Sequence, residues 1–514
     1  MNEIVKLTRS APVYDVAVKT PLELAPRLTD RLGFNVHLKR EDLQPVHSFK
    51  LRGAYNKIAS LSVSERGRGL VAASAGNHAQ GVALAASKLG ISALIVMPRT
   101  TPNIKVEAVK ALGAEIELAG DNYSEAADYC KTRVVDTGRV YVHPFDDPLV
   151  IAGQGTVGME VLDQLPVASH IFVPVGGGGL ISGIARFVKQ LRPDIKVISV
   201  EPEDSNVLQA SIEAGERVVL PHVGIFADGV AVKQIGKVTF PICQKYVDDY
   251  ITVTTDELCA AVKAIFEDTR SIVEGAGALG VAGAVTYAAT HDMTGAEAVA
   301  ICSGANLSFD RLQFIAERTS FGSANEAVFS VEMPEKPGML QRFCEQVVQG
   351  RNITQFGYRL RSRKFADMLV GVAVDDHEDK TQFERKMTRF GYTYADFSGD
   401  NTAKMHVRHM IGGPAPLAES ERFYSVYFPE RPGALSDFLE TVGTEWNISL
   451  FHYRGQGGDE GDILIGFEAR DPTGLEQRLT DAGYNFAPVT SAAAAMFLGY
   501  RDSRLPSKTE TAKR

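Results

Sequence analysis

The alternation of short apolar runs with longer amphipathic segments between Thr20 and Asn306 limits what this chain can fold into. Most of the runs lack the polar alternation of a half-exposed strand. Strands of this kind, separated by helices, are typical of parallel sheets covered on both faces, whose ligands lie beyond the carboxyl ends of the strands. We therefore predict an α/β unit with strands at 69–73, 92–97, 115–118, 171–175, 196–200 and 298–302, and helices at 79–89 and 105–112, the second ended by Gly113.

Beyond residue 322 the sequence repeats itself. Residues 329–340 recur as 424–435, and residues 352–359 recur as 447–454, each 95 residues later. A constant spacing indicates a duplicated domain. Each copy contains a strand, a Pro-Gly turn, a helix and a strand opened by Asn-Ile, an order that suits a ferredoxin-like βαββαβ unit. We expect domains over 1–322, 326–400 and 421–497, and a disordered tail over 503–514.

Composition excludes several classes of protein. The chain has 54 Lys and Arg against 63 Asp and Glu, a net charge of −9, which argues against nucleic acid or an anionic membrane as a partner. Its five cysteines are odd in number and too far apart for a metal motif, so we expect free, mostly buried thiols, no metal and a reducing compartment. We find no signal peptide and no membrane span, and we expect a cytoplasmic protein.

Lys50 lies between apolar residues in the stretch 46–54, at the start of a predicted helix. A lysine amine becomes a nucleophile when desolvation or a neighbouring cation lowers its pKa, or when it forms an imine. Arg52, two positions on, would supply such a cation. The ordinary alternative is a surface lysine with a buried stem. Three other stretches favour a functional lysine.

The first of these stretches follows the predicted strand at 69–73 and precedes a helix. A hydroxyl and backbone amides at a helix N-terminus attract anions such as a carboxylate. The alternative is a plain helix cap, which would not need glycine, asparagine and histidine together. The stretch consists of Ser74, Ala75, Gly76, Asn77 and His78.

The second stretch places four glycines, 176–179, between a predicted strand and a helix. Four backbone amides without Cβ atoms nearby can approach a phosphate. The pattern is neither G-x-G-x-x-G nor a P-loop, so a single phosphate monoester fits better than a pyrophosphate; a flexible turn is the alternative. The third stretch, 301–306, places the hydroxyl of Ser303 directly after the predicted strand at 298–302. A lysine, an asparagine loop, a phosphate cradle and a late hydroxyl together describe a pyridoxal phosphate site.

The stretches 48–54, 74–81, 176–180 and 303–306 resemble those of the biosynthetic threonine ammonia-lyases, among the tryptophan-synthase-β-like (fold type II) pyridoxal phosphate enzymes. The resemblance spans nearly the whole chain. It implies a PLP catalytic domain with parallel sheets, followed by two ferredoxin-like (α+β) ACT-like regulatory domains. It also implies dehydration and deamination of L-threonine to 2-oxobutanoate and ammonia, the first committed step of isoleucine biosynthesis.

The resemblance assigns roles to residues of this chain. It implies that Lys50 carries pyridoxal 5′-phosphate as an imine beside Phe49, that Asn77 meets the ring hydroxyl and that Ser303 bonds the pyridine nitrogen. The phosphate would be bound by Gly176, Gly177, Gly178, Gly179 and Leu180. The freed lysine amine would act as general base, and the loop 74–78 would hold the substrate carboxylate. A hydroxyl at the ring nitrogen, unlike a carboxylate, leaves that nitrogen unprotonated and favours β-elimination.

Regulation follows from the duplicated unit. The resemblance implies isoleucine as inhibitor, valine as antagonist in some members, and a homotetramer. Both copies place a Tyr-Arg pair at the end of the strand opened by Asn-Ile, where an effector would need a cation and an apolar wall. We predict effector contacts at Tyr358, Arg359, Tyr453 and Arg454; the alternative is ordinary strand residues with solvated arginines.

Two residues depart from the family pattern, since Gly275 stands where many relatives have proline and Asp228 where several have glutamate. We expect neither to touch the cofactor contacts. The rival enzymes on the same fold are serine dehydratases, racemases and β-replacement synthases, which have less need of regulatory domains. The rival from another class is a catalytically dead amino-acid sensor, against which Lys50, Asn77 and Ser303 argue.

Overall fold

The computed structural model describes residues 3–224, 226–309, 311–322, 326–334, 339–349, 351–360, 364–400, 420–429, 434–443, 445–454 and 460–490, with some side chains inside helices and strands left out. The tail predicted over 503–514 lies outside these residues. The chain divides into two compact units, one within Met1–Thr319 and the other within the chain from Ser320 onward, and each is described by itself.

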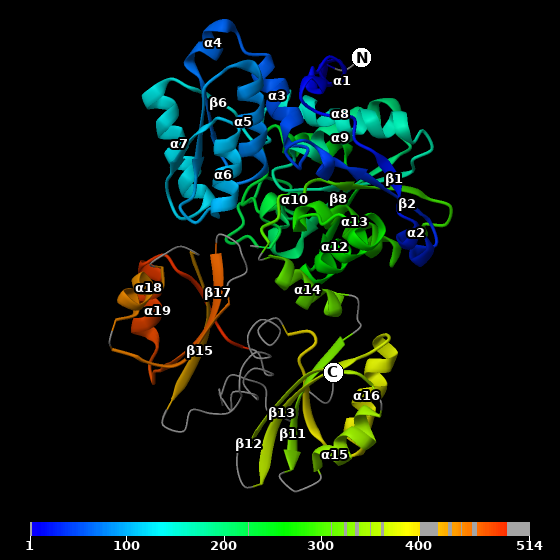
Figure 1. Cartoon of the computed structure of the whole chain (residues 1–514), viewed down its shortest axis with the longest axis vertical. Helices are drawn as coiled ribbons and strands as arrows, with labels where there is room; N and C mark the ends of the chain where they lie inside the picture. Colours follow the sequence, from blue (N-terminus) through cyan, green and yellow to red (C-terminus); the bar gives the residue numbers. More distant parts are fainter. Residues whose placement is uncertain are drawn as a thin grey trace. The chain divides into compact units, whose positions relative to one another are not determined.

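The first unit contains a six-stranded sheet built from β1 (Leu22–Leu24), β2 (Asn35–Arg40), β7 (His170–Pro174), β8 (Lys196–Pro202), β9 (Asp249–Val253) and β10 (Glu297–Cys302). The strands lie in the order β1-β2-β10-β7-β8-β9. Figure 1 labels β1, β2 and β8 of this sheet. All neighbours are parallel except β1, which pairs antiparallel with β2 at one edge. The predicted parallel sheet is confirmed, with this one antiparallel addition.

Helices cover both faces of this sheet, as the apolar strands require. Phe172 of β7 packs with the apolar residues of α12 and α13 on one face. Its neighbours Ile171 and Val173 point the other way and pack with those of α8 and α9. The helices and short turns around this sheet are α1 (Glu3–Arg9), η1 (Val13–Asp15), α2 (Pro26–Leu32), η2 (Glu41–Leu43), α8 (Pro148–Gln164), α9 (Gly179–Leu191), η3 (Glu203–Ser205), α10 (Val207–Ala214), η4 (Asp228–Val230), α11 (Thr239–Tyr246), α12 (Thr255–Thr269), α13 (Gly275–Ala288) and α14 (Arg311–Gly322).

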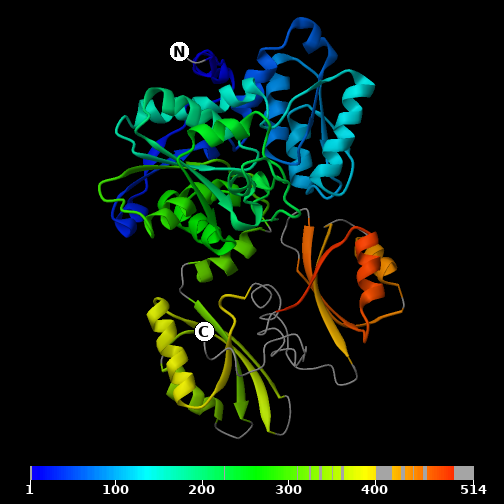
Figure 2. The same ribbon diagram turned by 180° about the vertical axis from the view of Figure 1, so that it is seen from behind.

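A second, four-stranded parallel sheet in the same unit consists of β3 (Leu70–Ala73), β4 (Ala93–Met97), β5 (Glu115–Leu118) and β6 (Val140–Tyr141), in the order β5-β4-β3-β6. Helix α7 (Tyr123–Thr137) covers one face, and α3 (Lys50–Ala59), α5 (Asn77–Leu89) and α6 (Asn103–Ala111) cover the other, as Figure 2 also shows from behind. A short helix, α4 (Val63–Arg68), precedes β3. Gly113, with φ of +88°, follows the end of α6 as predicted.

Two antiparallel four-stranded sheets make up the second unit. The first copy runs β11 (Glu326–Pro334), α15 (Met339–Phe343), a π-helical turn η5 (Cys344–Val348), β12 (Ile353–Leu360), β13 (Phe365–Ala373), α16 (His377–Arg389) and β14 (Thr393–Asp396). The second runs β15 (Glu421–Pro429), α18 (Ala434–Val442), β16 (Asn447–Arg454), β17 (Glu460–Glu468), α19 (Thr473–Asp481) and β18 (Asn485–Pro488). The strand orders β12-β13-β11-β14 and β16-β17-β15-β18 are those of a ferredoxin-like unit, which confirms the predicted βαββαβ topology.

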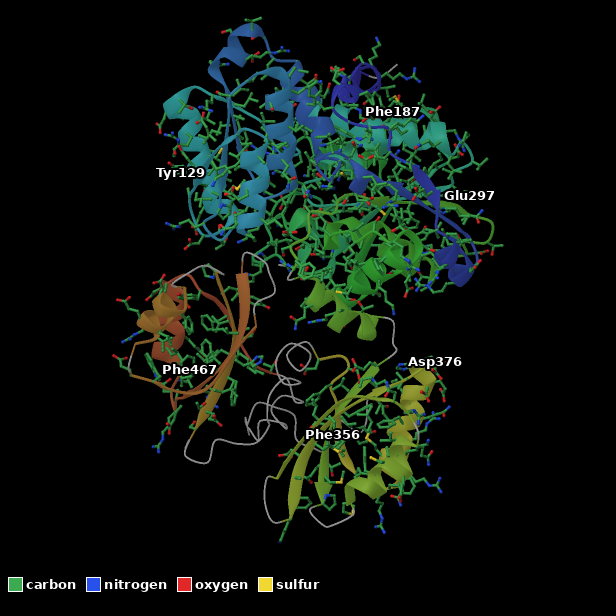
Figure 3. The ribbon with its side chains drawn as sticks, in the orientation of Figure 1. Tyr129, Phe187, Glu297, Phe356, Asp376 and Phe467 are labelled. Carbon is green, nitrogen blue, oxygen red and sulfur yellow. The ribbon has the colours of Figure 1, made fainter. Side chains whose placement is uncertain are left out.

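The two copies repeat each other in detail. Glu326 pairs with Ala373 in the first, and Glu421 pairs with Glu468, the same positions 95 residues on, in the second. Each copy has its own apolar core between sheet and helices, and Phe467 of β17 (Figure 3) lies fully buried in the second. The duplication in the sequence is therefore a duplication of fold.

Candidate active site

Lys50 is the first residue of α3, and the loop before it is bonded to the loop after β10. Phe49 N donates to the carbonyl oxygen of Ser303 at 3.2 Å, and Ala305 N donates to that of His47 at 2.9 Å. His47 adopts a left-handed φ of +55°, unusual for a residue with a side chain. These bonds bring Lys50 and Ser303 together, although 253 residues separate them in the chain (303 − 50).

The pKa of the Lys50 amine is lowered to about 8, because surrounding protein atoms desolvate it. The residue keeps some solvent exposure, so its amine is enclosed but remains accessible. Glu274 is the charged group that acts on it, and it works in the opposite direction by favouring the ammonium form. A pKa near 8 leaves an appreciable share of neutral amine at neutral pH, which nucleophilic chemistry requires.

Arg52 does not take part in this activation, and the prediction that it lowers the pKa of Lys50 is wrong. Its guanidinium is fully buried and pairs with Glu41 (Nε to Oε2, 2.7 Å) and Glu160 (Nη1 to Oε1, 2.6 Å). Lys39 Nζ completes the group at 2.6 Å from Glu160 Oε2. Two cations and two carboxylates thus form a neutral buried cluster that joins α3, β2, η2 and α8.

The loop 74–78 follows β3, as predicted, and α5 begins within it at Asn77. Asn77 Nδ2 donates to Glu274 Oε1 at 2.6 Å, and Asn77 Oδ1 accepts from Asn306 Nδ2. The His78 ring points elsewhere: it is buried, and its Nε2 bonds to the carbonyl oxygen of Val142 at 2.8 Å. Burial, then the charge of Lys50, lowers the pKa of His78 to about 3, so this ring is neutral.

The tetraglycine loop connects β7 to α9, and its glycines are needed for space. A Cβ at Gly177 would lie 2.3 Å from the Phe145 ring, and one at Gly176 would lie 2.9 Å from Val230 Cα. Gly178 has a φ of +87°. No described side chain caps α9, so the first amides of this helix are available to an anion. The loop therefore fits a phosphate group.

Two hydroxyls complete the site. Ser303 follows β10, and its Oγ donates to the carbonyl oxygen of Ala276 at 3.2 Å. Ser48 Oγ is buried and has no hydrogen-bond partner among the described residues. A buried hydroxyl without a partner, an enclosed lysine and a cradle of glycines fit pyridoxal phosphate, which carries an aldehyde, a ring with polar groups and a phosphate.

Glu274 was not predicted as a member of the site. It is the only charged residue between Arg270 and His291, and such a lone acid in an apolar stretch was the available signal. No role was predicted for Asn306 either, whose Nδ2 donates to the carbonyl oxygen of Val46 at 3.0 Å as well as to Asn77. Both Glu274 and Asn306 bond to Asn77, which is far from each of them in the sequence.

The two family departures lie close to Glu274. Asp228 Oδ2 pairs with Lys105 Nζ at 2.7 Å, and the charge of Asp228 acts on Glu274, which bonds Asn77. A Cβ at Gly275 would lie 3.0 Å from the Phe226 ring. Asp228 thus acts on Asn77, a predicted cofactor contact, only through Glu274.

All five cysteines are free, four of them buried. The described residues contain no cluster of three or more His, Cys, Asp or Glu suited to a metal. Among them, no helix is long and apolar enough to cross a membrane.

Two family comparisons cover most of the chain. Residues 13–304 match the family described as "Pyridoxal-phosphate dependent enzyme". Residues 317–407 and 415–498 both match "C-terminal regulatory domain of Threonine dehydratase". The second match occurs twice, as the repeat does.

Individual proteins agree with these matches. The chain is 48% identical over 491 residues to "L-threonine dehydratase biosynthetic IlvA" of Burkholderia multivorans, covering 94% of this chain and 97% of that protein. It is 47% identical over 497 residues to the Escherichia coli protein of the same name, covering 96% of both. Among solved structures, the processed form of threonine deaminase isoform 2 from Solanum lycopersicum matches with a TM-score of 0.61 and 47% identity, over 62% of this chain and 88% of that one. The chain therefore belongs to the pyridoxal-phosphate dependent enzymes and, among them, to the biosynthetic threonine dehydratases that carry a C-terminal regulatory domain.

Proposed function

We propose that the chain is a threonine ammonia-lyase that converts L-threonine to 2-oxobutanoate and ammonia with pyridoxal 5′-phosphate, as the first committed step of isoleucine biosynthesis. The observation that carries this proposal is that hydrogen bonds join the loops of Lys50, Asn77 and Ser303, in a chain that also has a tetraglycine loop with uncapped helix amides and a duplicated regulatory unit.

The donors present support the cofactor contacts that the family resemblance implies. Lys50 would hold the cofactor through its amine, whose nitrogen lies 5.2 Å from the centre of the Phe49 ring. Asn77 would donate its remaining amide hydrogen to the ring hydroxyl, and Ser303 would bond the ring nitrogen. The phosphate would lie on the amides of Gly176, Gly177, Gly178, Gly179 and Leu180.

The chain's own residues would then control protons and orientation. When bound, pyridoxal phosphate supplies an electron sink for the α-carbon of the amino acid. The neutral Lys50 amine would accept the α-proton as general base, because its lowered pKa suits proton transfer near neutral pH. The backbone of the loop 74–78 would hold the substrate carboxylate; His78 contributes its main chain, since its ring is engaged with Val142. Ser303, being uncharged, would leave the ring nitrogen without a counter-ion and so favour loss of the β-hydroxyl.

For regulation we propose that isoleucine binds the duplicated unit and that Tyr358, Arg359, Tyr453 and Arg454 contribute to its sites. The side chains of these four residues lie outside the described part of the structure. In the first copy the backbone of this pair lies near the end of β11. Arg359 pairs with Asp367, and Asp367 pairs with Glu332, two residues before the end of β11. The ends of β11 and β12 therefore lie at the same end of the sheet, and residues 337–338 follow β11 in sequence.

The remaining assignments are also proposals. We propose domain boundaries at 1–322, 326–400 and 421–497. The free thiols fit a reducing compartment, for which we propose the cytoplasm. The homotetramer and the antagonism by valine that the resemblance implies stay predictions.

The test is turnover of threonine and of serine by the purified protein, with and without isoleucine. We expect a yellow protein that forms 2-oxobutanoate from threonine and is inhibited by isoleucine. A colourless protein that binds isoleucine without turnover would favour the amino-acid sensor. Turnover of serine without threonine, indifferent to isoleucine, would favour a serine dehydratase.

A further inference from the structure

Glu274 immediately precedes α13, but its carboxyl group does not cap that helix. The residue is only 3% exposed, and its side chain accepts no amide of α13. Its Oε1 accepts instead from Asn77 Nδ2, at 2.6 Å. An acidic side chain at this position normally satisfies the first free amides of the helix. The bond between its carboxyl group and Asn77 therefore indicates a role other than helix capping.

A row of four side chains fixes the amide of Asn77. Gln80 Nε2 donates to Asn306 Oδ1 at 3.1 Å, Asn306 Nδ2 donates to Asn77 Oδ1, and Asn77 Nδ2 donates to Glu274. Because an amide nitrogen carries two hydrogens, one hydrogen of Asn77 Nδ2 is left for a ligand. Asn77 Nδ2 therefore keeps one hydrogen that it can donate to an oxygen on the cofactor ring.

Charged groups from three other elements act on Glu274. Lys50 belongs to α3, Asp228 to η4 and Lys105 to α6. Asp228 and Lys105 form an ion pair of 2.7 Å, and Arg311 acts on Asp228 in turn. The ion pair joins the helices of the four-stranded sheet to the part of the unit that contains Glu274.

We propose that Glu274 is a positioning residue whose carboxyl group, by gaining or losing a proton, sets the charge beside Lys50 and the hold on Asn77, and that the Lys105–Asp228 pair sets the pH at which this occurs. The inference rests on the proposed function, because Lys50 and Asn77 are the residues assigned there to the cofactor.

The charges around Glu274 support this proposal. Burial, followed by the charge of Asp228, raises the pKa of Glu274 to about 7, while the bond from Asn77 and the charges of Lys105 and Lys50 lower it. Below this pKa Glu274 is a neutral acid, and Lys50 loses the neighbouring negative charge that favours its ammonium form. Above it the carboxylate raises the pKa of Lys50 and accepts more strongly from Asn77.

The test begins with the cofactor-free protein, so that it does not depend on turnover. Infrared difference spectra recorded from pH 6 to 9 detect protonated carboxyl groups, and Asp and Glu with ordinary pKa values are almost fully ionised in that range. Glu201, whose pKa burial raises to about 8, contributes a background that all variants share. We expect Glu274→Gln to remove one titrating band. Retention of every band in that variant would overturn the proposal.

Two charge variants give opposite expectations. Asp228→Asn removes a negative charge and should lower the pH at which the Glu274 band titrates, and Lys105→Met removes a positive charge and should raise it, each by on the order of one pH unit. With the cofactor bound, its absorbance should show an inflection that moves in the same two directions and disappears in Glu274→Gln. A purely structural Glu274 would alter cofactor retention without moving the inflection.

Failure of this inference is distinguishable from failure of the proposed function. If wild-type protein binds no pyridoxal phosphate or does not turn over threonine, the proposed function fails, and the infrared titration still decides whether Glu274 changes charge. If threonine turnover is normal and neither charge variant moves the titration, the proposed function stands and the role of Glu274 is overturned.

Discussion

The amine of Lys50 differs from that of its helix neighbour Lys57 in surroundings rather than in chemistry. Lys50 is enclosed, with its pKa lowered to about 8, whereas Lys57 Nζ pairs with Asp147 Oδ2 at 2.8 Å, seven positions further along α3. Only the enclosed amine would therefore serve as nucleophile and general base. This pair of lysines gives a matched test.

We expect Lys50→Ala to lose the cofactor absorbance and essentially all threonine turnover while keeping the far-UV circular dichroism of the wild type. Lys57→Ala should retain both absorbance and turnover, because it removes only a partly exposed ion pair worth about 0–1 kcal/mol. Retained turnover in Lys50→Ala would contradict the assignment of this lysine.

Residues that follow strands were predictable, and residues that depend on distant partners were not. Asn77 and Ser303 lie at loops after β3 and β10, and the general rule for ligands of parallel sheets places them in one site. The role of Glu274 follows only from its bond to Asn77, which lies 197 positions away in the sequence. The same limit explains the wrong prediction for Arg52, whose partner Glu160 is 108 positions away.

At the scale of elements, the buried cluster of Lys39, Glu41, Arg52 and Glu160 holds α3 against α8. Removing one member leaves an unpaired buried charge, which typically costs about 3–5 kcal/mol. We expect Glu160→Ala to lower the free energy of unfolding by about that amount in urea denaturation. Asp163→Ala, on the same helix, removes only an exposed pair with Lys19 and should change it by less than about 1 kcal/mol. Equal effects of the two variants would contradict this account.

The tetraglycine loop makes a second prediction at this scale. Gly177→Ala would place its Cβ 2.3 Å from the Phe145 ring, so the loop or the ring must move. We expect weaker binding of pyridoxal phosphate, measured as a higher dissociation constant. Gly67→Ala in α4 is the control: its Cβ meets nothing within 4 Å, and it should leave cofactor binding unchanged while stabilising the helix by about 0.5–1 kcal/mol. Unchanged cofactor affinity in Gly177→Ala would contradict the proposed cradle.

Element types were predictable because their signals are local, and pairing between elements was less so. The apolar runs predicted β3, β4 and β10 to within one residue, whereas α5 begins at Asn77, two residues before the predicted start. Nothing local indicates that β1 lies antiparallel at an edge, since that pairing depends on β2, 13 or more residues away. The topology of the antiparallel sheets in the second unit was easier to predict, because the repeat shows the same sequence pattern twice.

At the scale of the whole molecule, the two units have separate apolar cores. Among the described residues, the clusters of the first unit end at Ile315 and those of the second begin at Ala327. Every residue assigned to the cofactor lies before this gap, and every residue assigned to isoleucine lies after it. Catalysis and inhibition should therefore be separable by a cut between the cores.

We expect a chain truncated after Phe321 to turn over threonine and to lose inhibition by isoleucine, measured as 2-oxobutanoate formation across an isoleucine titration. Tyr358→Ala and Tyr453→Ala in the full-length chain serve as milder variants that keep both units. Because allosteric coupling is typically about 1–3 kcal/mol, they should weaken isoleucine inhibition by up to about a hundredfold, with turnover near wild type in its absence. Loss of turnover in the truncated chain would show that the first unit needs the second. A soluble, active truncated chain that isoleucine still inhibits would place the effector site before Phe321 and overturn the regulatory role of the repeat.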